Sequence, residues 1–202
     1  SINDISTYQT DKYWIAEGSK GLRSIQRKGS NSFEALNEPI ILDGPYSNSA
    51  FDIVCKNDKV YMIIGGKDLL NGKRFDKGGY ILTYDYDKWS FIDPKEAQKK
   101  LNLPRNPRDY TSIAVTTDDS NDEIVYASSM GDGVIQYKNG TPVQSYNEKN
   151  AFKETAGGYG SGYCYIDGLA FDKNGNLWMT SSEVNHAVLV LDKAGAWHRL
   201  DI

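Results

Sequence analysis

The stretch GLAFDKNGNLWMTSS, residues 168–182, alternates apolar and polar side chains, passes through Asn174-Gly175 and resumes its alternation at a tryptophan. Alternation with a period of two predicts a β-strand with one buried face. The Asn-Gly pair tolerates positive φ at both central positions, as a two-residue type I′ turn requires. The stretch is therefore predicted to form a β-hairpin, with Trp178 on its second strand.

Three other segments look like the second strand of this hairpin. They are KYWIAEG from residue 12, KVYMIIGG from residue 59 and IVYASSMG from residue 124. The aligned aromatic residues are Trp14, Tyr61, Tyr126 and Trp178. They recur at irregular intervals of roughly 50 residues, which is typical of propeller blades with loop insertions.

Each copy follows an alternating strand that ends in a tight polar turn, and each precedes two further strand-like segments. This order predicts an all-β chain, a β-propeller of about four blades with four antiparallel strands each. We expect residues 1–202 to be a single propeller fragment belonging to a larger ring. The predicted blades cover residues 1–37, 48–93, 108–147 and 162–202. A β-sandwich with coincidental strand spacing is the alternative.

One segment, DPKEAQKKL from residue 93, is predicted to form a helix, with Asp93 as its cap and Pro94 at the first helical position. The chain opens directly into strand-like sequence at SINDIS. We therefore expect it to be an excised piece of a longer protein, so that the lack of a signal peptide indicates nothing about location.

Strand direction alternates within a blade, so the connections fall at two opposite ends. First-to-second and third-to-fourth turns are short, whereas second-to-third turns and blade-to-blade connections carry the long insertions. Binding residues concentrate on loops held by a rigid scaffold, so we expect the binding face at the long-loop end. Its candidate residues are Tyr46, Arg74, Arg108, Tyr159 and Tyr163. The alternative is that these aromatic residues only pack the loops against the blades.

The charge balance argues against a nucleic-acid partner. The chain carries 23 Lys and Arg against 27 Asp and Glu, a net charge of −4, which gives nucleic-acid binding no electrostatic support. No apolar run reaches membrane-spanning length. The two cysteines, Cys55 and Cys164, match no metal-ligand spacing, and we expect both to be free, buried and structural.

Sequence motifs for catalysis or cofactor binding are missing: there is no P-loop, G-x-G-x-x-G, G-x-S-x-G or H-E-x-x-H. His186 and His198 have no serine or cysteine placed beside them by sequence. Residues 172–183 partly match a calcium-binding EF-hand loop, but Leu177 stands where the sharp turn needs glycine. Nothing singles out a glycosidase carboxylate pair. We therefore predict no catalytic, cofactor-binding or metal-binding residues and no enzyme activity.

These motifs resemble those of known propellers. DGLAFDKNGNLWMTSS resembles the two-component regulator propeller repeat of Bacteroidetes, whose core pattern is D-x-x-G-x-L-W. The segments GPYSNSAFDI, VYMIIGG, RDYTSIAV, YASSMGDGVIQY and IDGLAFDKNGNLWMTSS resemble, in that order, the propeller region of PorZ-type proteins of the type IX (Por) secretion system. The similarity covers residues 44–202. The loop at 65–79 departs from it, with KDLL at residue 67 where the family has a glycine- and arginine-rich turn.

The resemblance implies a multi-propeller protein in the periplasm or at the cell surface. In the secretion system such a protein assists a sortase-like partner that attaches cargo to lipopolysaccharide. The matched motif positions are structural, so the resemblance implies no catalytic residue.

The leading functional hypothesis is a non-enzymatic, extracytoplasmic binding or scaffold module whose partner is a protein or a surface glycan such as lipopolysaccharide. A ligand-sensing ectodomain of a hybrid two-component system is the first alternative, and a glycan-acting propeller enzyme is the second. We also expect the isolated fragment either to close as a four-blade ring or to pair with a second copy, through apolar surface exposed near Ile5 and Leu189.

Overall fold

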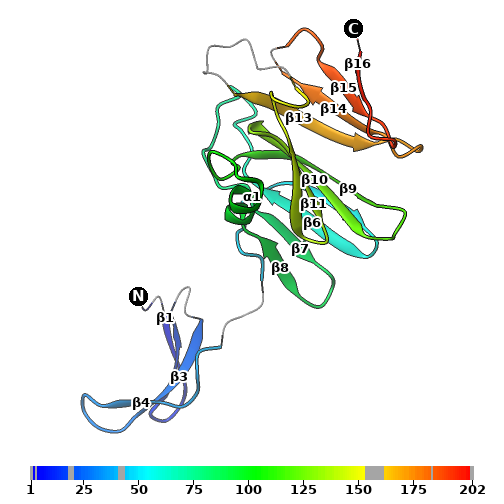
Figure 1. Ribbon diagram of the computed structural model, residues 1–202. Coiled ribbons are helices and arrows are strands. Elements are labelled where there is room, and N and C mark those ends of the chain that lie inside the picture. The colour runs from blue at the N-terminus through cyan, green and yellow to red at the C-terminus, as the bar shows by residue number, and fades with distance from the viewer. Residues whose placement is uncertain are drawn as a thin grey trace. The chain divides into compact units, whose positions relative to one another are not determined.

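The structure is a computed structural model that describes residues 2, 4–17, 21–40, 44–152, 162–182 and 184–200. The chain divides into two compact units, Ser1–Gly44 and Pro45–Ile202. It is mostly β, and its strands group into sets of four consecutive antiparallel strands (Figure 1).

The first unit is one antiparallel sheet with the strand order β1-β2-β3-β4. Its strands are β1 (Asp4–Gln9), β2 (Lys12–Ala16), β3 (Leu22–Arg27) and β4 (Phe33–Ala35). Ile15 and Ser24 are the buried residues among those described in this unit. Ile5, by contrast, is 54% exposed, so the sheet presents apolar side chains at its surface, as expected near Ile5.

The second unit contains three groups of four strands. The first group forms one sheet of β5 (Ala50–Lys56), β6 (Lys59–Ile64), β7 (Ile81–Tyr84) and β8 (Trp89–Ile92). The second group is β9 (Tyr110–Thr117), β10 (Glu123–Gly131), β11 (Gly133–Lys138) and β12 (Thr141–Tyr146). The third group is β13 (Cys164–Phe171), β14 (Leu177–Ser181), β15 (Val188–Leu191) and β16 (Trp197–Leu200). The last two groups share one sheet, because the end of β10 pairs with the start of β13.

The central group of this unit is covered on both faces. One core cluster joins β9–β12 to β5–β8 and includes Ile113, whereas the other joins β9–β12 to β13–β16 and includes Ala114. Successive side chains of a strand point to opposite faces of its sheet. The continuously buried first part of β9, residues 110–115, therefore serves two cores at once. Between β9 and β11, the hydroxyls of Tyr110 and Tyr137 satisfy each other inside the core at 2.6 Å.

A chain of hydrogen bonds joins the first strands of the three groups. The Asp52 carboxylate of β5 accepts from the Ser112 hydroxyl and the Ile113 N–H of β9, both at 3.1 Å. The Ser112 hydroxyl accepts in turn from the Leu169 N–H of β13 at 3.2 Å. These bonds fix the spacing of neighbouring groups of strands, from which the connecting loops emerge.

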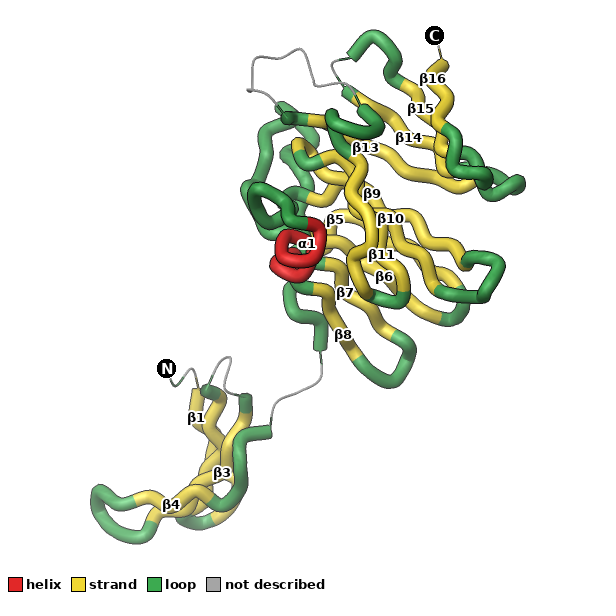
Figure 2. The backbone as a smooth tube through the Cα atoms, in the orientation of Figure 1, coloured by secondary structure: helices red, strands yellow, loops and turns green. Residues whose placement is uncertain are grey.

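The predicted helix is confirmed as α1 (Pro94–Leu101), which Figure 2 shows in red beside the strands. The Asp93 side chain accepts from the Lys95 N–H at 2.9 Å and caps the first turn. Asn102 ends the helix in the left-handed conformation.

The hairpin turns are of two kinds, and the Asn174-Gly175 turn differs from its prediction. Asn57 and Asp58 both have positive φ, 52° and 54°, as a type I′ turn requires. At Asn174-Gly175 only the glycine does, with φ 85°, because the loop is longer: the Asp172 N–H donates to the Asn176 carbonyl at 3.0 Å. The Asp172 carboxylate accepts from the Asn174 and Asn176 N–H groups at 2.9 Å, which favours the five-residue turn over the two-residue one.

The four aligned aromatic residues lie on the second strands of their groups, β2, β6, β10 and β14, as the repeat predicts. Their environments differ. Tyr61 and Tyr126 are buried, whereas Trp178 is 39% exposed and donates its indole N–H to Asp172 at 3.1 Å. The D-x-x-G-x-L-W pattern is thus a turn motif in which the aspartate holds both the loop and the tryptophan.

Two expectations about burial are wrong. Cys55 is exposed, although Cys164 is buried and neither cysteine forms a disulfide, as expected. Leu189 is also buried, because β15 packs into the core shared with β9–β12, so the apolar surface expected there is covered within the unit. Among the described residues, no helix is long and apolar enough to cross a membrane.

Candidate binding face

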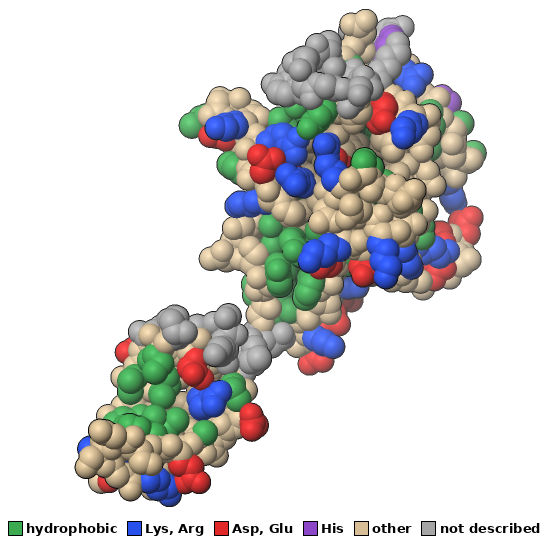
Figure 3. Space-filling view, turned by 60° about the vertical axis from the view of Figure 1, so that its left-hand side comes forward, with side chains coloured by type: hydrophobic (Ala, Val, Ile, Leu, Met, Phe, Trp, Pro, Cys, Tyr) green, Lys and Arg blue, Asp and Glu red, His purple; other side chains and the backbone are tan. Residues whose placement is uncertain are grey.

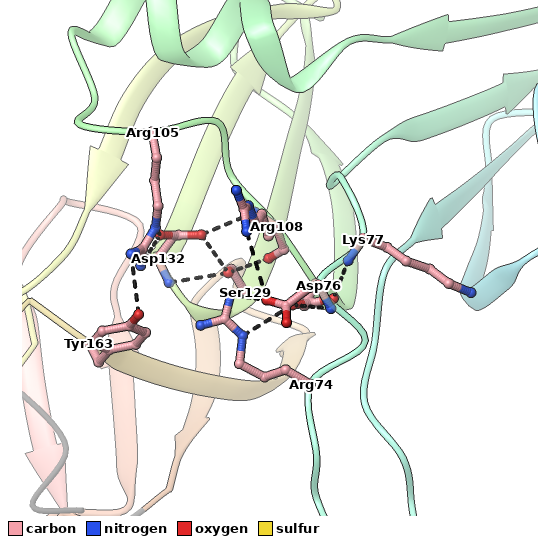
Figure 4. A network of polar contacts seen from close by, with 9 residues as sticks. Arg74, Asp76, Lys77, Arg105, Arg108, Ser129, Asp132 and Tyr163 are labelled. Carbon is pink, nitrogen blue, oxygen red and sulfur yellow. Dashed lines mark hydrogen bonds and ion pairs between the residues drawn. The ribbon is translucent and has the colours of Figure 1, made fainter. Parts of the chain in front are cut away.

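Four connecting segments of the second unit meet at the long-loop end. They are the β6–β7 loop, the segment after α1, the turn between β10 and β11, and the residues before β13. Single β-bridges tie them together, including Gly78 with Arg108 and Asp132 with Cys164. Figure 4 shows the resulting arginine–tyrosine cluster, which we define as Arg74, Asp76, Arg105, Arg108, Asp109, Asp132 and Tyr163.

Asp109 organises one half of the arginine–tyrosine cluster. Its side chain is fully buried, and its carboxylate accepts from the Arg74 Nε at 3.1 Å and from the backbone N–H groups of Asp76 and Lys77 at 3.1 and 2.9 Å. A buried carboxylate is tolerated when it is paired and hydrogen-bonded in this way. Asp109 therefore fixes the β6–β7 loop and the Arg74 side chain together.

Asp132 organises the other half. Its carboxylate accepts from the Arg105 Nε at 2.7 Å and from the Arg108 N–H at 3.1 Å. The Ser129 hydroxyl donates to the Arg108 carbonyl at 2.6 Å and accepts from the Asp132 N–H at 3.1 Å. The β10–β11 turn and the segment after α1 are thereby locked to each other.

Tyr163 contacts two guanidinium groups. The ring centre lies 5.6 Å from the Arg74 Cζ and 4.8 Å from the Arg105 Cζ, within the range of cation–π attraction. A side chain at Gly131 would collide with this ring, because its Cβ would stand 2.9 Å from the Tyr163 Cδ1. Glycine at this position, with φ 130°, lets the tyrosine and Arg74 approach the turn closely.

Arg108 is the most accessible arginine of the cluster. Its side chain is 47% exposed, compared with 18% for Arg74. The charged partner of its side chain is Asp76, 3.8 Å away and itself 68% exposed. Such an exposed ion pair is weak. The Arg108 guanidinium can therefore exchange Asp76 for another anion.

Both better-paired arginines remain cationic. Burial alone would lower the pKa of the Arg105 guanidinium, but the charge of Asp132 and the hydrogen bonds to Asp132 and Tyr163 raise it. Burial alone would also lower the pKa of the Arg74 guanidinium. The hydrogen bond to Asp109 and the charges of nearby aspartates raise that pKa instead.

The structure brings together three of the five residues that the sequence indicated. Arg74, Arg108 and Tyr163 belong to the cluster. Tyr46 lies elsewhere, stacked on Tyr80 and Phe91 with ring centres 4.8 Å apart in each case. A hydrogen bond with Tyr46, partial burial and nearby charge raise the pKa of Tyr80 to about 12. Tyr159 lies outside the described residues.

Sequence reasoning missed Arg105, Asp109, Asp132 and Asp76. The available signals were the dense RNPRD run at residue 105 and the GDG turn at residue 131, where an aspartate between two glycines indicates a special backbone shape. Neither signal reveals that the two segments meet, because their contact depends on how the groups of strands pack.

A groove lies at the short-turn end of the same unit. It has a volume of about 670 Å³ and lies between β9–β12 and β13–β16. Its floor includes Tyr126, Phe171 and Trp197, and Lys138 and Lys193 stand among its lining residues. It contains none of the five candidate binding residues that the sequence indicated.

Comparison with known proteins gives a likeness in structure. No protein-family model matches the sequence, and no curated protein sequence matches it. PorZ, a surface component of the type IX secretion system of Porphyromonas gingivalis, matches 100% of this chain with a TM-score of 0.64 and 23% identity. The extracellular domain of a putative hybrid two-component system from B. thetaiotaomicron matches 100% of it with a TM-score of 0.46 and 12% identity.

The match to PorZ shows a shared fold, which is β-rich and propeller-like. This chain covers 26% of the PorZ chain and 23% of the two-component ectodomain. It thus spans about a quarter of the length of either protein.

Proposed function

We propose that this chain is a non-enzymatic binding module, part of a larger β-propeller outside the cytoplasm, and that its long-loop face binds an anionic surface glycan. The arginine–tyrosine cluster is the observation that carries the proposal. Planar guanidinium groups match carboxylate and phosphate oxygens, and an aromatic ring beside them offers a flat apolar surface. An anionic polysaccharide offers charged oxygens to the guanidinium groups and the apolar faces of its sugar rings to the tyrosine.

Preorganisation supports a binding role. Asp109 and Asp132 hold Arg74 and Arg105 in place before any ligand arrives, so less side-chain entropy is lost on binding. Arg108 adds an exposed guanidinium whose ion pair with Asp76 is weak enough to exchange.

The same geometry argues against Asp109 and Asp132 as acid–base catalysts. The carboxylate of each accepts from an arginine and from at least one backbone N–H group. A general acid or base must instead be free to exchange a proton with its substrate. An extracytoplasmic location is supported by the fold shared with PorZ, which is a bacterial surface component.

The test is calorimetric titration of the chain with polysaccharide released by mild acid from Porphyromonas gingivalis lipopolysaccharide. We expect binding, and we expect Arg108→Ala to weaken it about 10- to 100-fold, the loss for a hydrogen-bonded charge pair. Lys193→Ala is the matched control. It also removes one exposed positive charge, but at the short-turn end, and should bind like the original chain.

Three outcomes would contradict the proposal. No binding of the polysaccharide would reject a glycan ligand and leave a protein as the partner of this face. Equal losses for Arg108→Ala and Lys193→Ala would reject the cluster as the site. Time-dependent shortening of the polysaccharide would show that the chain is an enzyme.

A further inference from the structure

The β6–β7 loop presents two leucines to solvent at the apex of a turn. Leu69 is 81% exposed and Leu70 is 97% exposed, the most exposed large apolar side chains among the described residues. The loop is a hairpin, since Lys67 bridges to Arg74 and the Asp68 N–H donates to the Lys73 carbonyl at 2.8 Å. We call its apex, residues 68–73, the leucine tip.

The leucine tip is ordered by its own hydrogen bonds. The Asp68 carboxylate accepts from the Leu70 N–H at 2.8 Å and from the Asn71 amide at 3.0 Å. The Asn71 side chain accepts from the Lys73 N–H at 2.8 Å, and Gly72 turns the chain with φ 69°. Because the backbone is fixed in this way, the leucines cannot fold back onto the loop to escape water.

The base of the loop is clamped to the body of the second unit. Arg74 pairs with the buried Asp109, and Lys67 pairs with Asp167 of β13 at 2.6 Å. Exposed apolar pairs held on such a rigid support indicate an interaction surface.

Exposed cations lie in the tip and at the base of the loop that carries it. Lys73, Lys77 and Arg108 are exposed, and the Lys77 ammonium lies 5.2 Å from the centre of the Phe75 ring, which is 46% exposed. Figure 3 shows several Lys and Arg side chains close together on the second unit, with acidic side chains among them. Of the acids near the tip, Asp109 and Asp132 are largely buried and paired with arginines. Asp68 is partly buried and bound to the tip's own donors, whereas Asp76 is strongly exposed.

We propose that the leucine tip inserts into the headgroup–acyl boundary of an anionic lipid bilayer, as a peripheral contact. Leu69 and Leu70 enter the apolar layer, while Lys73 and Lys77 stay at the level of the anionic headgroups. A lipid surface suits two adjacent leucines at a turn apex, because it requires no shape complementarity. Leucine is under-represented among the anchoring residues of protein interfaces. The contact is weak, reversible and sensitive to salt.

The experiment is co-sedimentation of the chain with vesicles of equal parts phosphatidylglycerol and phosphatidylcholine, and with vesicles of phosphatidylcholine alone. We expect stronger binding to the anionic vesicles, reduced by added salt. The double variant Leu69→Ser/Leu70→Ser should bind at least about tenfold more weakly, because it removes the apolar area that is buried. The double variant Leu69→Ile/Leu70→Ile should keep the binding.

Val143→Ser is the matched control, since it also makes an exposed apolar residue polar, but on β12. Val143→Ser should bind vesicles like the original chain. All the variants should have the melting temperature of the original chain, because none of the substituted side chains is buried. The proposal is overturned if the original chain does not bind anionic vesicles. It is also overturned if the serine double variant binds these vesicles as strongly as the original chain. A serine double variant that instead converts a dimer to a monomer in sizing experiments would identify a second copy as the occupant. Vesicles without polysaccharide keep this result separate from the glycan proposal.

Discussion

Asp109 is fully buried, yet its carboxylate collects an arginine and two backbone N–H groups. Asp132, Asp172 and Asp192 work in a related way, each accepting from a backbone N–H and from a side chain. In every case one residue sets the shape of a loop and aims a second side chain. These aspartates therefore have structural effects well beyond their own positions.

Asp109→Ala should destabilise the chain by about 3–5 kcal/mol. The change leaves the largely buried Arg74 guanidinium with only the exposed Asp76 as a charged partner, along with two unpaired N–H groups. Urea denaturation measures the loss of unfolding free energy. The control is Asp119→Ala, which removes an ion pair whose carboxylate is 88% exposed and should cause no measurable change. Equal stability of the two variants would contradict the role assigned to Asp109.

Asp172 should make acid stability depend on pH in a defined window. Hydrogen bonds from the Trp178 indole and from Asn176 lower the pKa of its carboxyl to about 2, below the value of roughly 3.9 usual for an unfolded chain. The ionised form therefore contributes stability that is present above about pH 4 and is lost as the pH falls toward 2.

Asp172→Asn should accordingly be less stable than the original chain at pH 7, with the difference shrinking below pH 4. Urea denaturation at several pH values measures this difference. A difference that stays constant down to pH 2 would show that the carboxylate charge is not what holds the turn.

At the scale of the element, the strands followed from the sequence because their pattern is local. Alternation and tight polar turns mark each hairpin, and Asp93-Pro94 marks the start of α1. The turn at Asp172 was harder to predict, since Asn174-Gly175 fits two turn lengths and the aspartate decides between them. Prediction failed for the cluster for a different reason. Asp109 and Asp132 acquire their partners only when segments distant in sequence meet.

Three five-residue turns share one pattern of backbone hydrogen bonds; they begin at Asp118, Asp172 and Asp192. In each turn the N–H of the first residue donates to the carbonyl of the fifth, and the N–H of the fourth residue donates to the carbonyl of the first. The fourth residue has positive φ in all three, at Asn121, Gly175 and Gly195. Gly175→Ala should therefore cost about 1–2 kcal/mol, the penalty of a side chain in this conformation. Asn121→Gly should stay within about 0.5 kcal/mol of the original chain, because both residues tolerate it.

Thermal unfolding of both variants measures these costs. An alanine at Gly175 that leaves the melting temperature unchanged would show that the turn relaxes to another shape.

Trp197 joins β16 to the neighbouring group of strands, as its ring packs edge-on against Tyr146 and Phe152 at 5.4 Å in each case. Trp197→Ala should cost about 2–4 kcal/mol, since it removes a half-buried aromatic residue that bridges two groups of strands. Trp89→Ala should cost less, about 1–2 kcal/mol, because Trp89 stacks on Tyr84 within its own hairpin. Denaturation with urea gives both values. A larger loss for Trp89→Ala would contradict this ranking.

At the scale of the whole second unit, the two ends of the sheets differ in kind. The short-turn end is built from aspartate-capped turns around the groove lined by Tyr126 and Trp197. The long-loop end holds the arginine–tyrosine cluster and the leucine tip, which share Arg74 as a structural link. The proposed glycan contact and the proposed lipid contact both lie at the long-loop end, which the loop lengths in the sequence indicated as the binding face.

NMR chemical-shift perturbation on the isotopically labelled chain, titrated with the polysaccharide, maps the binding face most directly. We expect the largest changes on the amides of Arg105, Arg108, Asp132 and Tyr163, with little change at the short-turn end. Perturbations concentrated at Tyr126, Lys138 and Trp197 would place the ligand in the groove between β9–β12 and β13–β16, and would show that the long-loop face is not the binding face.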